Sequence, residues 1–281
     1  DVGRPDLAQK SNDISQEDLA GILYDSLRKK IMPLDDDVLV YPAHGAGSAC
    51  GKNLSNKTVS TIGEQKKTNY ALRDNMSKDE FIREVTQGLT PPPNYFPLNV
   101  KMNKEGYDDI DKIIAHGTTP LDPDSFENIS KMKNVLILDV RHQDDFAKEH
   151  IPNSILIGID GSFAPWVGTI IEDVTKPILL LSPEDRVEET VTRLARVGFD
   201  NCLGFLKGGI KNWMMLGKLT ANVNVIDSAV FKKLTKNEEL KVFDLRKLDE
   251  YISGHIPNAK NIPLDLVNQK NVLSKLSIDS S

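Results

Sequence analysis

The fold is decided by the stretch Val135-Leu136-Ile137-Leu138-Asp139-Val140-Arg141, which is followed by the turn sequence His150-Ile151-Pro152-Asn153. The same pattern returns as Val242-Phe243-Asp244-Leu245-Arg246 and His255-Ile256-Pro257-Asn258. One offset of 105 residues relates both parts of the pattern without a gap. Because this period has the size of a domain, the sequence predicts a tandem duplication and not a solenoid of short repeats.

The first copy alternates short apolar runs with helical segments. Apolar residues recur at helical spacing between Val187 and Val197, and Gly198 is expected to end that helix in a left-handed cap. Strands are predicted at 135–139, 155–159, 177–181 and 203–206, and another helix is predicted at 144–149. This alternation predicts an α/β domain with a parallel sheet covered on both faces. The second copy begins near Val223 and spans about half a domain.

Residues 1–110 have a different pattern. A helix is predicted at 16–31, and a strand at 38–41 leads into a glycine-rich loop. Ser77 and Glu80 form a capping box that opens a helix from 78 to 87. Three prolines at 91–93 then start an extended crossing to about Gly106. We therefore expect three domains, at 1–108, 109–220 and 221–281.

Composition limits the class of protein. Charged residues make up 27% of the 281 residues, and the formal net charge of -6 argues against a nucleic-acid-binding protein. No apolar run approaches the roughly 18 residues of a membrane span. Two cysteines exclude a disulfide scaffold and cysteine-rich zinc sites. We therefore expect a cytoplasmic protein with neither nucleic acid nor membrane as a partner.

Two residues near the N-terminus could bind a metal. Asp1 opens the chain in Asp1-Val2-Gly3-Arg4-Pro5-Asp6, and His44 follows the predicted strand in Pro42-Ala43-His44-Gly45. By residue type alone, Asp1 could be a ligand, a helix cap or a turn residue. His44 could be a ligand or a histidine hydrogen-bonded within its turn. Because the chain opens inside a turn, we expect it to be a fragment whose metal site includes upstream residues.

Together these segments resemble the C-terminal half of the metallo-β-lactamase fold. The resemblance implies that Asp1 is a metal ligand and that His44 belongs to the metal site. The stretch Val59-Ser60-Thr61-Ile62-Gly63-Glu64-Gln65-Lys66, with Asn69, resembles the branch that contains persulfide dioxygenases. That branch is implied to bind one Fe(II) through two histidines and a carboxylate, which leaves positions open for O2 and a sulfur anion.

The same resemblance suggests two substrate-binding residues. Lys66 falls where the branch has a basic residue that can hold a substrate carboxylate, and Arg4 lies in the turn that carries the ligand aspartate. Zinc is the alternative metal, and it would imply a thioester hydrolase of the glyoxalase II type.

The two cysteines have different surroundings. Cys50 lies between small residues and close to Lys52, an environment that favours the thiolate. It is the candidate catalytic cysteine, which would accept or relay sulfane sulfur, although a small buried thiol is the alternative. Cys202 precedes an apolar strand, and we expect it to be structural.

The repeat resembles rhodanese, a sulfurtransferase domain. The matching sequences are Asp139-Val140-Arg141, His150-Ile151-Pro152-Asn153, Ile178–Leu181, Gly198-Phe199 and Gly208-Gly209-Ile210-Lys211-Asn212-Trp213. Rhodanese needs a cysteine at the start of the loop after its central strand, where backbone N–H groups stabilise a persulfide.

In the first copy that loop has no cysteine. It reads Leu181-Ser182-Pro183-Glu184-Asp185-Arg186, with Arg186 at the position of the loop-ending arginine. The cysteine position falls on Leu181, or on Ser182 if the loop is one residue short. Glu184 and Asp185 would repel an anionic sulfur species. We therefore expect the first copy to be inactive and to serve in docking, and we expect further chain to complete the second copy.

These resemblances imply an enzyme of sulfide detoxification. It would oxidise the persulfide of a small thiol with O2 at a mononuclear Fe(II) site to sulfite, and rhodanese modules would couple this step to sulfane-sulfur transfer and thiosulfate. The expected partners are the thiol persulfide, O2, sulfite and thiosulfate, and a homo-oligomer is possible. A non-catalytic binding or regulatory protein built on rhodanese domains is the third reading.

Overall fold

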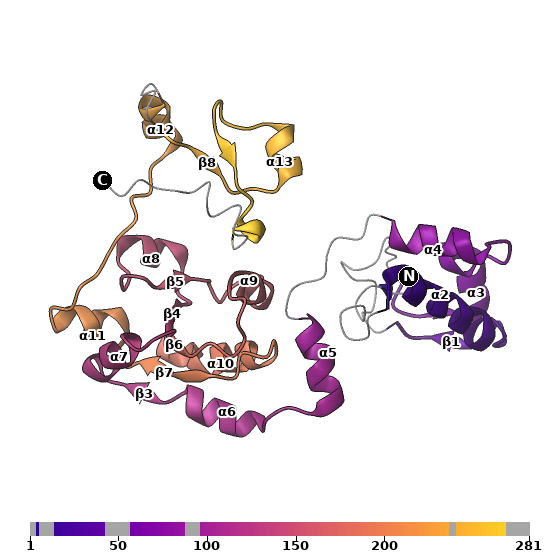
Figure 1. The fold of residues 1–281 in the computed structure, drawn as a ribbon, viewed down its shortest axis with the longest axis horizontal. Helices are drawn as coiled ribbons and strands as arrows, with labels where there is room; N and C mark the ends of the chain where they lie inside the picture. The colour runs from indigo at the N-terminus through magenta and orange to yellow at the C-terminus, as the bar shows by residue number, and fades with distance from the viewer. Residues whose placement is uncertain (1–3, 6–13, 43–56, 88–95, 236–239, 268–281) are drawn as a thin grey trace. The chain divides into compact units, whose positions relative to one another are not determined.

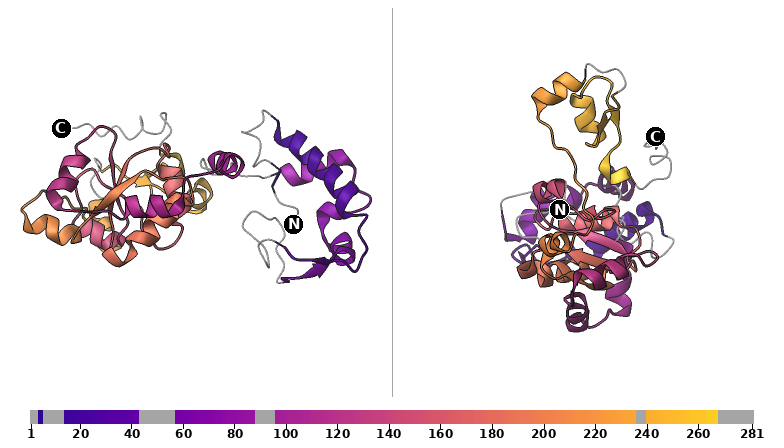
Figure 2. Two further views of the ribbon diagram at one scale, coloured as in Figure 1. Left: turned by 90° about the horizontal axis from the view of Figure 1, so that it is seen from below. Right: turned by 90° about the vertical axis from the view of Figure 1, so that its left-hand side faces the viewer.

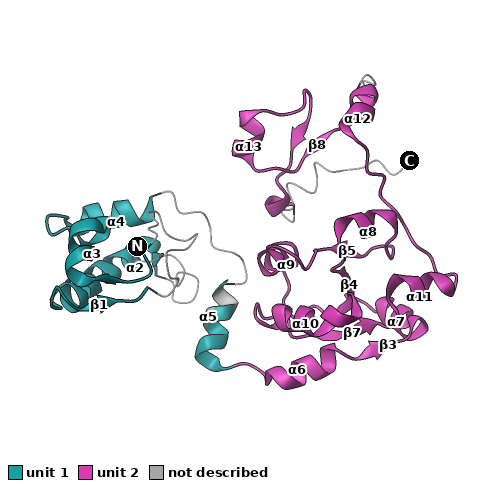
Figure 3. Ribbon diagram, turned by 180° about the vertical axis from the view of Figure 1, so that it is seen from behind, with its two compact units in different colours: residues 1–106 teal, residues 107–281 magenta. Residues whose placement is uncertain are grey.

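The computed structural model describes residues 4–5, 14–42, 57–87, 96–235 and 240–267. It divides the chain into two compact units, Asp1–Gly106 and Tyr107–Ser281 (Figure 3). The division lies two residues before the boundary expected from the sequence.

Unit 1 is built on two helices that pack side by side, α2 (Gln16–Ser26) and α4 (Lys78–Thr86). A π-helical turn, Leu27–Ile31, extends α2 through the rest of the predicted helix. The predicted capping box between Ser77 and Glu80 is confirmed, and Ser15 and Asp18 form a second one at the start of α2. Such boxes satisfy backbone donors that the first turn of a helix leaves free.

The elements between α2 and α4 are short. Strands β1 (Leu39–Val40) and β2 (Ser60–Thr61) pair antiparallel, and helix α3 (Ile62–Thr68) follows directly. A 3-10 turn, Tyr70–Leu72, then leads towards α4. The helical core consists of side chains from α2, the π-helical turn, α4 and the segment between α3 and α4. Its buried members are Ala20, Leu27, Ala71, Leu72, Met76, Phe81 and Val85.

The expectation of an extended crossing up to Gly106 is wrong for its second half. Residues Phe96–Glu105 form helix α5. Pro97 occupies the first turn of this helix, where the missing N–H costs nothing and the fixed φ of proline suits helical backbone. The proline run therefore precedes a helix instead of beginning a long extended segment.

Unit 2 contains a five-stranded sheet in the order β3-β7-β6-β4-β5, with every neighbouring pair parallel (Figure 1). The strands are β3 (Pro120–Leu121), β4 (Leu136–Asp139), β5 (Ile155–Leu156), β6 (Ile178–Leu181) and β7 (Cys202–Leu206). All residues of β4 and β6 are buried. A strand buried on both faces reads as a continuous apolar run, which explains why the sequence located these two well.

Helices cover the sheet on both faces (Figures 1 and 2). These are α6 (Ile110–Gly117), α7 (Pro123–Ser130), α8 (Gln143–Lys148), α9 (Phe163–Ile170), α10 (Val187–Ala195) and α11 (Gly209–Met215). Phe126 of α7 and Trp213 of α11 share one core cluster with Leu179 and Leu181 of β6. Helix α6 packs against α10 and β7. The predicted α/β class with a parallel sheet is confirmed, as is the left-handed backbone of Gly198 after α10.

The second copy repeats the start of the first. It contains α12 (Ser228–Leu234), β8 (Phe243–Asp244), α13 (Leu248–Ser253) and β9 (Lys260–Asn261). Strands β8 and β9 pair parallel in the register of β4 and β5, residue for residue at the offset of 105. Within the described ranges, none of the helices combines the length and apolar character needed to cross a bilayer.

Candidate functional site

The loop that follows β6 lies at the carboxyl edge of the parallel sheet, where open α/β sheets bind their ligands. Strand β6 ends at Leu181, and Ser182 and Pro183 follow. A 3-10 turn, Glu184–Arg186, then leads directly into α10. The loop is therefore a tight turn joined to a helix.

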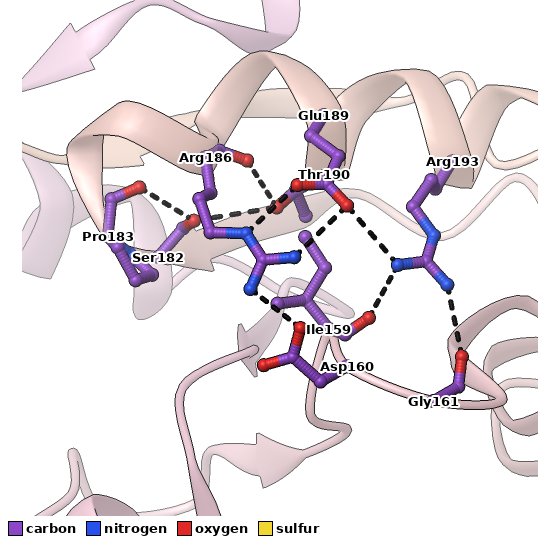
Figure 4. Close-up of polar contacts among 9 residues, drawn as sticks. All are labelled: Ile159, Asp160, Gly161, Ser182, Pro183, Arg186, Glu189, Thr190 and Arg193. Carbon is purple, nitrogen blue, oxygen red and sulfur yellow. Dashed lines mark hydrogen bonds and ion pairs between the residues drawn. The ribbon is translucent and has the colours of Figure 1, made fainter.

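Ser182 points into the protein and not towards solvent. Only 2% of the residue is exposed. Its hydroxyl donates to the Pro183 carbonyl at 3.0 Å and lies 3.4 Å from Oγ1 of Thr190 (Figure 4). Leu181 is fully buried and pairs with Asp139 in the sheet register. Ser182 is thus the first residue beyond the strand, and neither side chain offers a thiol.

Arg186 is held by two carboxylates. Its Nη1 lies 2.9 Å from Oδ1 of Asp160, which belongs to the segment after β5, and its Nε lies 2.9 Å from Oε2 of Glu189 in α10. The hydrogen bonds from Arg186 hold the pKa of Glu189 below its usual value, and both carboxylates raise the pKa of Arg186. The guanidinium is therefore already occupied by anions of this chain.

Arg193 of α10 makes further contacts with the segment after β5. It donates to the carbonyls of Ile159 and Gly161 and forms an ion pair with Glu189 (Figure 4). Its guanidinium also lies over the Phe163 ring, 5.2 Å from the ring centre. Together Arg186 and Arg193 tie the segment after β5 to one face of α10.

A further carboxylate closes the loop towards α11. The backbone N–H of Gly208 donates to Oε1 of Glu184 at 2.7 Å. Gly208 has a φ of 77°, in the left-handed region that glycine adopts readily. The donor therefore faces an anion that the protein itself supplies.

The residues predicted for the metal site and for the sulfur relay are not among those that the structure describes. Asp1, His44 and the candidate catalytic Cys50 lie outside the described residues. Within the described ranges, no three or more His, Cys, Asp or Glu side chains are grouped so that they could hold a metal.

The two predicted substrate-binding residues both belong to unit 1. Lys66 lies on α3, and its Nζ is 2.7 Å from Oδ1 of Asp36 and 3.3 Å from the Leu34 carbonyl. A substrate carboxylate would have to compete with Asp36 for this ammonium group. Arg4 is half-buried. Ser182 and Arg186, by contrast, lie together in the loop of unit 2.

Three other side chains noted in the sequence make contacts within the rhodanese copies. Cys202 is fully buried, and burial raises the pKa of its thiol to about 12, with a smaller effect from the charge of Asp200. The imidazole of His150 stacks on Phe146, and that of His255 stacks on Tyr251 at the matching position of the second copy.

Sequence reasoning missed Asp160, Glu189 and Arg193 as partners in the loop. Glu189 and Arg193 lie three and seven residues after Arg186 on one helix, so helical spacing could have indicated them. Asp160 carries no such signal, because only the tertiary fold brings it to Arg186.

These features define a rhodanese-type α/β domain in which the turn after the central strand contains a buried serine and no cysteine. The family of the rhodanese-like domain matches residues 122–216 and 227–279, which is more than half of the chain. The chain belongs to the rhodanese family. No curated protein matches it.

Solved structures add a second similarity. The chain is 28% identical to a metallo-beta-lactamase from Staphylococcus aureus subsp. aureus COL, with a TM-score of 0.57, over 72% of this chain and 55% of that one. This chain thus spans about half the length of that protein. Unit 2 holds less than 72% of the chain, so the similarity reaches into unit 1.

Weaker similarities link the chain to the Alr3790 protein from Anabaena sp. and to EanB. Each is 19% identical with a TM-score of 0.34. The Alr3790 match covers 42% of this chain and 95% of that one, and the EanB match covers 59% and 44%. At these scores neither similarity bears on the function.

Proposed function

We propose that this chain belongs to a persulfide dioxygenase and sulfurtransferase, which oxidises the persulfide of a small thiol with O2 to sulfite and transfers sulfane sulfur. One observation supports this proposal above the others. The same chain carries a tandem rhodanese region and a similarity to a metallo-beta-lactamase that extends beyond it. Joining the two raises the local concentration of a reactive sulfur intermediate, a physical reason for the fusion.

In this proposal the first rhodanese copy docks and does not carry sulfur. A sulfurtransferase needs a thiolate in a cradle of free backbone donors. Here Ser182 is buried, and the Gly208 N–H is taken by Glu184. Any sulfur transfer by the rhodanese region is then assigned to the second copy.

The proposed metal site uses Asp1, with His44 close to the metal. A carboxylate and an imidazole belong to the donor set of mononuclear Fe(II) oxygenases, and the bound iron would bring O2 and the sulfur anion together. Lys66 would orient the carboxylate of the substrate in exchange for its contact with Asp36. Cys50 would relay sulfane sulfur from the metal site.

The test is metal analysis and O2 uptake by the full-length protein, purified without air. The proposal expects about one iron per chain, O2 uptake with a thiol persulfide, and sulfite as the product. Two zinc ions and thioester hydrolysis without O2 uptake would instead establish a hydrolase of the glyoxalase II type, in which metal-activated water attacks the substrate.

Cysteine variants distinguish a sulfur relay at Cys50 from a general effect of removing a thiol. Cys50→Ser should lower thiosulfate formation while O2 uptake continues, and Cys202→Ala is the matched control with the other cysteine removed. Thiocyanate formation from thiosulfate and cyanide reports on sulfur transfer. If neither O2 uptake nor thiocyanate formation is found, the third reading, a non-catalytic binding protein, replaces the proposal.

A further inference from the structure

Helix α4 forms one wall of a pocket in unit 1. Phe81 and Val85 on one side of this helix are buried in the helical core. Glu80, Arg83 and Glu84 line a pocket of about 630 Å³ together with Arg73 from the preceding segment. This volume lies within the range of sites for small molecules. All the residues that line the pocket belong to unit 1.

The position of Arg73 is fixed by two contacts. Its Nε donates to the Tyr70 carbonyl at 3.0 Å, and its own carbonyl accepts a hydrogen bond from Arg28 at 2.9 Å. In the described part of the chain, the terminal nitrogens of Arg73 have no partner of their own. A held guanidinium with free donors is well suited to a carboxylate, which it can bind in a bidentate manner.

The second guanidinium and a carboxylate of the pocket are also uncommitted. Among the described residues, the Arg83 guanidinium makes no hydrogen bond or ion pair. Glu80 receives both hydrogen bonds from Ser77 on Oε2, at 2.9 and 2.8 Å, which leaves Oε1 without a described partner. These bonds lower the pKa of Glu80, and the charges of Arg83 and Arg73 add to the effect, so the group is ionised.

Opposite charges three residues apart on a helix can form an ion pair with each other. Arg83 and Glu80 instead line one pocket without forming an ion pair between their described side chains. A pure anion would meet the carboxylate of Glu80 here, and a pure cation would meet the guanidinium groups of Arg73 and Arg83. A ligand that carries both charges on neighbouring atoms satisfies Glu80 and the two arginines.

We propose that this pocket binds the head of a free α-amino acid, with its carboxylate at Arg73 and Arg83 and its ammonium group at Glu80. This site goes beyond the proposed function, and it needs neither a metal nor O2. The polar side chains of Asn75 and Gln87, which also line the pocket, favour an amino acid with a polar side chain. L-Glutamine is therefore the first probe.

The test is a ligand titration followed by NMR saturation transfer, with the whole chain. L-Glutamine should bind saturably. Glutaramate lacks only the ammonium group and γ-aminobutyramide lacks only the carboxylate, and each should bind at least about tenfold more weakly. Equal binding of glutaramate would overturn the proposal in favour of a simple anion site. No saturable binding of L-glutamine would show that the pocket is merely a solvated surface.

Variants test the named contacts. Arg83→Gln and Glu80→Gln should each weaken L-glutamine binding about tenfold or more, and glutamine at position 80 can still serve the capping box. Arg196→Gln removes an exposed arginine of unit 2 and is the control, with unchanged binding. Unchanged binding in both pocket variants would overturn the amino-acid site. A protein that takes up no O2 would contradict the proposed dioxygenase function but not this site.

Discussion

The carboxylate of Glu184 accepts a 2.7 Å hydrogen bond from the backbone N–H of Gly208, across the turn where a rhodanese would hold an anionic sulfur. The turn therefore supplies its own anion. Arg186 likewise pairs with Asp160 and Glu189, so its guanidinium also meets carboxylates of the protein itself. A loop whose polar groups are paired within the protein is what we expect of a rhodanese copy that has no cysteine to carry sulfur.

The first prediction is that Ser182→Cys does not create a reactive thiol. The side chain at position 182 is buried and faces Thr190 and the Pro183 carbonyl, with Glu184 close in sequence, so burial and negative charge both disfavour a thiolate. Titration with a chromogenic disulfide should find no more fast-reacting thiol than in the parent chain. A new fast-reacting thiol, or new thiocyanate formation from thiosulfate and cyanide, would contradict an inactive first copy.

The second prediction concerns Cys202. Burial raises the pKa of its thiol to about 12, so almost none is thiolate near neutral pH. In a Cys50→Ser chain, iodoacetamide should modify Cys202 only after urea unfolds unit 2. Modification in native buffer at the rate of an exposed thiol would show that β7 opens far more readily than its packing indicates.

The third prediction compares two glycines. Gly204 has a φ of 133°, and a Cβ there would lie 2.5 Å from the Thr119 carbonyl oxygen, which pairs β3 with β7. Gly161 has a φ of 85° and nothing within 4 Å of its Cβ position. Gly161→Ala should cost about 1–2 kcal/mol of unfolding free energy from backbone strain alone. Gly204→Ala should cost more, about 3 kcal/mol or above, because backbone must move as well. Equal losses in urea unfolding would exclude the contact with Thr119.

The fourth prediction concerns the carboxylate of Asp244. Hydrogen bonds from the Arg246 side chain and backbone lower the pKa of this group. A lowered folded-state pKa means that the contribution to stability is complete above the unfolded value of about 3.9 and is lost as the pH falls through the folded value. NMR titration of the Asp244 carboxyl carbon should give a pKa below 3.9, and Arg246→Gln should raise it. An unchanged pKa in that variant would contradict this origin.

The sequence predicted the structure most accurately where a pattern repeats. The 105-residue offset located both copies, and the structure shows β8 and β9 in the register of β4 and β5. Buried parallel strands are continuous apolar runs, and helix caps depend on neighbours three residues apart, so both can be read along the chain. The rhodanese family could therefore be recognised from the sequence alone.

The closure of the loop was decided by tertiary structure. The sequence showed that the cysteine is missing and that acidic residues surround its place. It could not show that Asp160, 26 residues before Arg186, pairs with that guanidinium, or that Glu184 meets Gly208. An ion pair forms where two elements come together in space, and that distance depends on how the strands and helices pack. The sequence alone thus determined that the loop of this copy has no cysteine. Only the fold determined which side chains and backbone groups pair with the charged residues of that loop.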